Sequence, residues 1–324
     1  MLFRRGLLIL LLALTFAVIP LLAVWLEEPY LVSLFTRIAI FALAAVSLDL
    51  ILGYGGMVSF GHAAFFGLGS YVTAILWQHA EEGEPLLGVL AGTQQALVAW
   101  PAAMAVGGLA AALIGLASLR TSGLYFIMIT LAFAQMLYYF FVSFGRYGGE
   151  DGLALYSRNT LPGLDLADPV VFYYVTLALL TIFLLLFHRL VDARLGAVLR
   201  GCRQNEPRMR ALGFPVLRYK LTAFVIAGMA AALAGALMAN HIEYTSPSFL
   251  HWKQSGELLI MVALGGIGSL YGAVLGAGAL VLLEEQLSIY TEHWQVILGP
   301  ILIAVVFFAR RGLYGFLVRD DDSE

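Results

Sequence analysis

The sequence predicts an all-α polytopic membrane protein with about ten transmembrane passes, Gly-rich broken segments and both termini in the cytoplasm. Composition is the first observation behind this prediction, since 61% of the 324 residues are hydrophobic and 12% are charged. A soluble domain has about 45–50% apolar and about 25% charged residues, so this chain could not cover a soluble surface. The other two observations are apolar runs of spanning length and basic residues gathered in particular connecting segments. Together they exclude a cytosolic enzyme, a nucleic-acid-binding protein and a disordered chain.

Reactive and metal-binding side chains are scarce. The lone cysteine, Cys202, can form neither an internal disulfide nor a cysteine-cluster metal site. The 6 histidines include no H-x-x-x-H or H-E-x-x-H spacing, which a zinc site on a helix requires. We therefore expect no metal and no catalytic residue on this chain.

Apolar runs of about 20 residues are long enough to span a bilayer as helices. They lie at residues 7–24, 30–52, 58–78, 96–119, 124–144, 170–187, 221–239, 258–283 and 294–309. The first run follows Arg4 and Arg5, as a signal peptide would, but it is long and no small-residue cleavage site follows. We expect it to be an uncleaved first span, with a cleaved signal as the alternative.

Positive charge predicts the orientation, because Lys and Arg in short loops resist translocation. Arg4 and Arg5 place the N-terminus inside, and the segment 189–220 carries 8 of the 18 basic residues, which makes it cytoplasmic. If 258–283 were one helix, the acidic segment 284–293 would be inside and Arg310 outside, both against the rule. If the run instead breaks between Gly265 and Gly272 into two passes, the acidic segment lies outside and Arg310 lies inside, as the rule requires.

Two glycine-rich stretches resemble each other. Residues 55–69 read GGMVSFGHAAFFGLG and residues 265–278 read GGIGSLYGAVLGAG, and an offset of 210 aligns several identities. This indicates a weak internal repeat, which is common in transporters. Glycine clusters permit unwound backbone along a cavity, so one interpretation is a translocation path. The other, of equal weight, is close helix packing left by duplication. The candidate path residues are Gly55, Gly56, Ser59, His62, Gly265, Gly266 and Ser269.

Charged residues inside apolar runs are costly and are candidates for function. Asp49 lies beside the first glycine stretch, and it could cap a helix, pair with Arg120 or reach the interface. Arg37 is expected to extend outward along its long side chain. There is no series of intramembrane acids of the kind that proton-driven carriers use.

The segment 189–220 predicts a short capped helix. Asn205 and Glu206 precede Pro207, which suits a first helical turn, and Gly213 can end the helix. A helix of about two turns is marginal alone, so we expect it to dock on another protein. The alternative is a positively charged loop that contacts acidic lipids.

Several stretches resemble the LivM-type permease subunit of branched-chain amino acid ABC importers. They are 48–76, 125–137, 196–237 (which contains GAVLRGCRQNEPRMRALGFPVLRYK), 259–277 (LIMVALGGIGSLYGAVLGA) and 310–315 (RRGLYG), so the resemblance covers nearly the whole chain. It implies a single transmembrane permease domain over 1–324 in a bacterial inner membrane, with a cytoplasmic coupling loop at 189–220.

The resemblance also implies partners: a second homologous permease subunit, two ATP-binding subunits and a periplasmic substrate-binding protein. It implies that the short helix is the segment that couples the permease to the ATPase, although Pro207 and Arg208 replace the two alanines of the family pattern. The coupling candidates are Arg203, Asn205, Glu206, Arg208, Arg210, Ala211 and Gly213. It further implies contact with membrane lipid, none with nucleic acid, and branched-chain amino acids or related small polar solutes as substrates.

ATP must be hydrolysed elsewhere, because neither Lys220 nor Lys253 lies in a G-x-x-x-x-G-K-[ST] loop. We therefore expect no cofactor on this chain. The alternatives are a urea- or amide-type permease of the same family and an ion-coupled secondary transporter, which the scarcity of intramembrane acids disfavours. An intramembrane enzyme built on Ser59 and His62 is weaker still, because no third group would orient the histidine.

Overall fold

The computed structural model describes residues 12, 14–23, 28–85, 91–290, 293, 296–297, 299–300 and 312–317. The expected spans 7–24 and 294–309 fall partly or largely outside these residues. Arg4, Arg5, Arg310 and Arg311 lie outside them as well. The expected placement of both termini therefore rests on residues that the structure does not describe.

The regular secondary structure of the described residues is helical, apart from two short strands that pair antiparallel. This confirms the all-α prediction. In chain order the elements are α2 (Pro29–Asp49), η1 (Leu50–Tyr54), α3 (His62–Glu82), α4 (Ala96–Ser118), α5 (Leu124–Ser143), η2 (Gly145–Tyr147), β1 (Leu153–Ala154), α6 (Pro169–Asp192), α7 (Arg194–Ala211), α8 (Val216–Ile242), β2 (Tyr244–Thr245), η3 (Pro247–Leu250), α9 (Trp252–Gly265), α10 (Leu270–Tyr290) and α12 (Gly312–Leu317).

Within the described ranges, six helices are long and apolar enough to cross a membrane: α2 with η1, α4, α5, α6, α8 and α10. The polytopic prediction is therefore confirmed. The expected total of ten passes exceeds these six, since α3 is 21 residues long but does not meet the same criteria, and α9 has only 14 residues. The run expected at 58–78 begins as a helix only at His62.

Helix α8 lies at the centre of the bundle, where small residues let backbones approach closely. A Cβ placed on Gly235 would lie 1.7 Å from the Phe66 carbonyl oxygen, and one on Gly69 would lie 1.8 Å from that of Ala232. A Cβ on Gly107 would likewise lie 2.3 Å from the Ala232 Cβ. Helices in lipid associate through such close packing, because no hydrophobic force drives them together.

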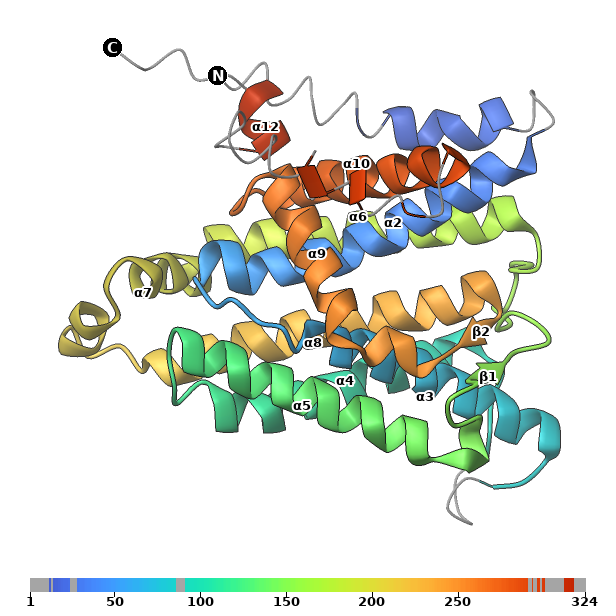
Figure 1. The fold of residues 1–324 in the computed structure, drawn as a ribbon, viewed down its shortest axis with the longest axis horizontal. Coiled ribbons are helices and arrows are strands. Elements are labelled where there is room, and N and C mark those ends of the chain that lie inside the picture. Colours follow the sequence, from blue (N-terminus) through green and yellow to red (C-terminus); the bar gives the residue numbers. More distant parts are fainter. Residues whose placement is uncertain are drawn as a thin grey trace.

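The long helices α2, α5, α6 and α8 run along the long axis of the molecule (Figure 1). Helix α7 lies at one end of this axis, and the β1–β2 ribbon lies at the other. The basic segment and the mostly acidic connection 145–169 therefore lie at opposite ends, as their charges predict for two sides of a membrane.

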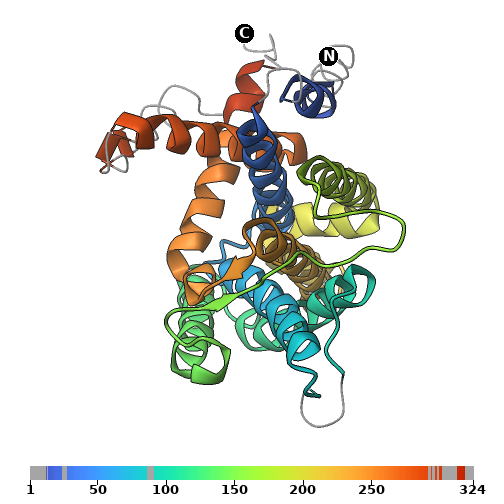
Figure 2. The ribbon, with the colours of Figure 1, turned by 90° about the vertical axis from the view of Figure 1, so that its right-hand side faces the viewer.

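Helices α9 and α10 form the expected broken segment. Helix α9 ends at Gly265, α10 begins at Leu270, and α9 descends steeply across the bundle while α10 turns sharply away from it along the top (Figures 1 and 2). Gly266 and Gly268 have φ values of 116° and 88°, which side chains other than glycine rarely adopt. The break is narrower than expected, and α10 is longer, because it continues beyond residue 283 to Tyr290.

The extension of α10 gives Arg37 two acidic partners. Its guanidinium pairs with Glu284 at 3.1 Å and with Glu285 at 3.8 Å. The pair joins α2 to the part of α10 that the apolar pattern had left outside the helix.

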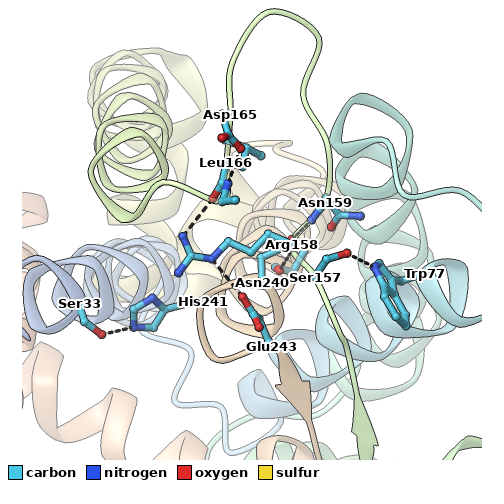
Figure 3. Close-up of polar contacts among 12 residues, drawn as sticks. Ser33, Trp77, Ser157, Arg158, Asn159, Asp165, Leu166, Asn240, His241 and Glu243 are labelled. Atoms are coloured by element: carbon cyan, nitrogen blue, oxygen red, sulfur yellow. Dashed lines mark hydrogen bonds and ion pairs between the residues drawn. The ribbon is translucent and has the colours of Figure 1, made fainter. Parts of the chain in front are cut away.

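The end of the molecule opposite α7 is held together by Arg158, which lies in the connection between β1 and α6 (Figure 3). Its guanidinium donates to the Leu166 carbonyl at 3.0 Å, pairs with Glu243 at 3.7 Å and lies 4.8 Å from the centre of the Phe172 ring. Next to it, the backbone N–H of Asn159 donates to the side chain of Asn240 at 2.7 Å. This network fastens the connection to the end of α8.

Candidate functional site

Helix α7 has two parts that meet at Asn205. This residue is non-helical, with φ −158° and ψ 95°, and its side-chain oxygen accepts from the Arg208 N–H at 3.0 Å. It is therefore the N-cap of a second, short helical part that ends at Ala211, as the sequence predicts.

The first part of α7, residues 194–204, was missed from the sequence. Leu195, Val198, Leu199 and Cys202 have the i, i+3, i+4, i+7 spacing of an amphipathic helix, which is the signal that could have found it. In the structure Val198 and Cys202 are buried against Val216 at the start of α8.

The short helix ends in a complete Schellman motif. The Phe214 N–H donates to the Met209 carbonyl at 3.2 Å, and the Gly213 N–H donates to the Arg210 carbonyl at 2.9 Å. Gly213 has φ 84°, so glycine is needed at this position. Phe214 and Met209 pack in one apolar cluster, which fixes the exit of the chain toward α8.

Glu206 links the short helix to α8. Its carboxylate accepts from Lys220 at the start of α8 and from Arg210 one turn further along α7. Burial opposes ionisation of Glu206, but the hydrogen bonds and charges of Lys220 and Arg210 outweigh it and lower the pKa of this carboxyl. The short helix is thus fastened to α8 by a charged pair as well as by apolar contacts.

A cavity of about 380 Å³ lies between this segment and the membrane helices. It brings together four residues that the sequence assigned to two separate roles: Gly55, Gly56, Arg203 and Glu206. Its remaining wall comes mainly from residues 119–127, at the turn between α4 and α5, and from Lys220. The expected coupling segment therefore adjoins the first glycine stretch directly.

Arg203 and Asp49 bring the two glycine stretches to the same place. Arg203 donates to the Gly53 carbonyl at the end of the π-helical turn η1, and Asp49 accepts from the Gly268 N–H at 2.8 Å. A Cβ placed on Gly53 would lie only 2.5 Å from the Gly268 nitrogen. None of the three alternatives for Asp49 describes this contact: the carboxyl group is fully buried and its partner is an N–H in the break between α9 and α10, 219 positions away.

The remaining path candidates lie away from the cavity. Ser59 is fully buried and accepts from the Gly61 N–H at 3.2 Å, and His62 is fully buried with its Nε2 2.8 Å from the Ser47 hydroxyl. Ser59 and His62 occupy the packed interior and are not among the residues that line the cavity.

In the second stretch the candidates shape the break itself. Ser269 accepts from the Gly272 N–H at 3.1 Å, and a Cβ on Gly265 would lie 1.9 Å from the Gly272 carbonyl oxygen. Gly266 provides the turn at the end of α9. Gly53, Gly268 and Lys220 were not among the expected site residues, and no local pattern marks them, because each acquires its contact through a distant segment.

A family model described as "Branched-chain amino acid transport system / permease component" matches residues 30–306. The chain belongs to this family. Members are permease components, so this permease is a transport protein and not an enzyme.

The permease is 27% identical over 322 residues to the high-affinity branched-chain amino acid transport system permease protein LivM of Salmonella typhimurium, a match that covers 90% of this chain and 73% of that protein. It is 27% identical over 328 residues to LivM of Escherichia coli, covering 91% and 73% of the two chains. It is also 25% identical over 293 residues to the LivH permease of Escherichia coli, covering 85% and 91%. No solved structure gives a significant match.

Proposed function

We propose that this permease is a subunit of an ATP-binding cassette importer for branched-chain amino acids in a bacterial inner membrane. It forms the translocation path with a second, homologous permease and couples that path to separate ATPase subunits. The family and the branched-chain amino acid transport function of its LivM and LivH relatives support this assignment. The similarity to both relatives also supports pairing between two homologous permeases.

The observation that carries the coupling role is the contact of α7 with the first glycine stretch at the cavity, made by Arg203 just before the capped helix. The short helix is built to hold its shape, with Asn205 at one end and Gly213 at the other. Because its other face is joined to α8 through Glu206 and Lys220, a push on this helix would be transmitted into the bundle. A short exposed helix that is capped at both ends and linked to α8 is better suited to dock on an ATPase than to make a non-specific contact with lipid.

The translocation path is proposed to run beside the two glycine stretches. Gly55 and Gly56 line the cavity at the α7 end, and the break between α9 and α10 leaves backbone groups outside regular helix. Such irregular backbone is tolerated at membrane depth where it is buried in protein or lines a cavity. Alternating access then follows from movement of rigid helices about these breaks.

The substrate-binding protein is proposed to dock at the opposite end, over the connection that Arg158 holds in place (Figure 3). The well-anchored backbone there offers a stable surface for a partner that delivers substrate. No ATP-binding or other cofactor site is proposed on this chain, because hydrolysis belongs to the partner subunits.

The test is copurification of an affinity-tagged chain from gently solubilised native membranes, with the copurifying subunits identified by mass spectrometry. An ATP-binding cassette subunit and a second permease are expected with the wild type. Gly213→Pro, which removes the N–H that closes the helix, is expected to release the ATPase while the permease pair remains.

Substrate and energy source are tested by uptake in cells. ATP-dependent leucine uptake, with urea and simple amides as poor competitors, is the expected result. Preferred transport of urea would favour the urea- or amide-type permease of the same family. Uncoupler-sensitive uptake by a chain that copurifies with no ATPase would contradict the proposal and favour an ion-coupled carrier.

A further inference from the structure

Arg203 has an unusual position for an arginine on a cytoplasmic helix. It belongs to the first part of α7 and is an exposed residue, yet its guanidinium contacts the membrane helices. Its Nη1 donates to the carbonyl of Gly53, in the π-helical turn that ends α2. The last carbonyls of a helix lack partners within the helix, so this contact satisfies a group that would otherwise be unpaired.

The same guanidinium also lies against the second glycine stretch. A Cβ placed on Gly268 would be 3.6 Å from the Arg203 Nη1, which is ordinary van der Waals distance. Nearer its backbone, a Cβ on Gly56 would be 3.0 Å from the Arg203 Cγ. Arg203 therefore bonds to the first break, the π-helical turn η1, and lies close to the second, the 266–269 turn between α9 and α10, although the two lie more than 200 residues apart in the chain.

The two breaks are also joined directly to each other, next to Arg203. Asp49 accepts from the Gly268 N–H, and a Cβ on Gly53 would lie 2.5 Å from the Gly268 nitrogen, so Gly53 could not carry a side chain without displacing the Gly268 backbone. A displacement of Arg203 would therefore act on one joined unit rather than on two independent turns.

We propose that Arg203 is the positioning residue that makes the two glycine breaks move together with the cytoplasmic helix. This rests on the proposed importer function. When the ATPase subunits displace the short helix, the first part of α7 follows, and Arg203 shifts Gly53 and the 266–269 turn in one step. Breaks in regular helix bend at lower cost than helix interiors, because fewer i→i−4 hydrogen bonds are lost.

Arg200 provides a matched control on the same helix. Its Nη1 donates to the Val191 carbonyl near the end of α6 at 2.9 Å, so it too satisfies a carbonyl near a helix end. That carbonyl belongs to neither glycine break. Loss of Arg200 therefore removes a comparable structural contact without removing the connection that the proposal requires.

The experiment replaces the chromosomal copy with Arg203→Ala, Arg203→Lys or Arg200→Ala and measures two quantities. The first is uptake of radiolabelled leucine by cells, and the second is ATP hydrolysis by the purified complex. For Arg203→Ala we expect at least a tenfold fall in uptake, ATP hydrolysis within twofold of the wild type, and the ATPase subunit still present. Arg203→Lys should be intermediate, since an ammonium can donate to the Gly53 carbonyl but lacks the planar group that also lies against Gly268.

Three results would overturn the inference. If leucine uptake and ATP hydrolysis fall in the same proportion in Arg203→Ala, the arginine serves only as a helix cap. Loss of the ATPase subunit from that variant would make Arg203 an ATPase contact instead. An equal loss of uptake in Arg200→Ala would show a general effect of removing arginine caps. A wild-type complex without an ATPase would instead contradict the importer function itself, so the two failures are distinguishable.

Discussion

Asp49 and Gly268 are 219 positions apart in the chain, yet the Asp49 carboxylate accepts a hydrogen bond of 2.8 Å from the Gly268 backbone N–H. Asp49 is fully buried at the end of α2, and Gly268 lies in the break between α9 and α10. The bond thus joins the end of α2, just before the first glycine stretch, to the break between α9 and α10. Because of this hydrogen bond, the two segments are held together directly and do not merely lie side by side.

Replacing Asp49 by alanine leaves the Gly268 N–H without its acceptor. An unpaired buried donor costs about 1–3 kcal/mol, and this donor is part-buried, so we expect a lower thermal unfolding temperature of the detergent-solubilised permease, with a cost toward the lower end of that range. Asp49→Asn keeps an oxygen acceptor of the same shape and should lose much less. Equal losses in the two variants would show that the charge, and not this hydrogen bond, stabilises the junction.

Gly53→Ala tests the close approach itself. The new Cβ would lie 2.2 Å from the Asp49 Oδ1 and 2.5 Å from the Gly268 nitrogen, so the two breaks must separate. We expect leucine uptake to fall at least tenfold, with the permease still in the membrane. Gly145→Ala is the control, because a Cβ there meets nothing within 4 Å and its φ is negative. Normal uptake by Gly53→Ala would contradict the importance of this contact.

Asn205→Ala removes the side-chain cap of the docking helix. Loss of an N-cap costs about 1 kcal/mol of helix stability, which should weaken ATPase binding by roughly fivefold if the helix must be formed to dock. The measurement is the ATPase-to-permease ratio after copurification across a salt series. Asn205→Asp, which can cap equally well, should restore the ratio. If Asn205→Ala and Asn205→Asp lower the ATPase-to-permease ratio equally, loss of the N-cap is not the reason for the weaker binding.

Acid should weaken the attachment of the docking helix to α8. The lowered pKa of Glu206 means that its ion pairs stabilise the folded state above its ordinary value of 4.5. This contribution should disappear as the pH falls through the lower, folded-state pKa. The test compares thermal unfolding of the wild type and Glu206→Gln from pH 7 to pH 3. Their difference should be constant above pH 5 and vanish in acid, whereas a constant difference throughout would contradict the assignment.

Arg158→Ala should destabilise the end of the molecule opposite α7. The side chain is only 12% exposed, and it loses a hydrogen bond to the Leu166 carbonyl together with the Glu243 pair, a cost of about 2 kcal/mol. Arg146→Ala is the matched control, because its pair with Glu84 joins two side chains that are both more than half exposed. Exposed pairs contribute about 0–1 kcal/mol, so limited proteolysis of 145–168 should be faster only in Arg158→Ala.

The sequence by itself determined the all-α membrane class, the short capped helix and the interruption after Gly265. Each depends on local chemistry: spanning length for the apolar runs, side-chain capping at Asn205, and positive φ at Gly213 and Gly266. The apolar pattern ended the last described long helix at residue 283, whereas α10 continues to Tyr290, and this error has a physical reason. Glu284 and Glu285 resemble a loop in a hydropathy reading, but Arg37 on α2 pairs with both and they remain helical.

Only the tertiary structure decided which of the candidate residues meet. Gly55 and Gly56 adjoin Arg203 and Glu206 at one cavity, whereas His62 lies in the packed interior. The partners of Arg203 and Asp49 are backbone groups of Gly53 and Gly268, and any residue has a carbonyl or an N–H to offer. Side-chain type therefore carries no information about these contacts, which arise only when packing of α2, α7, α9 and α10 brings distant backbone segments together.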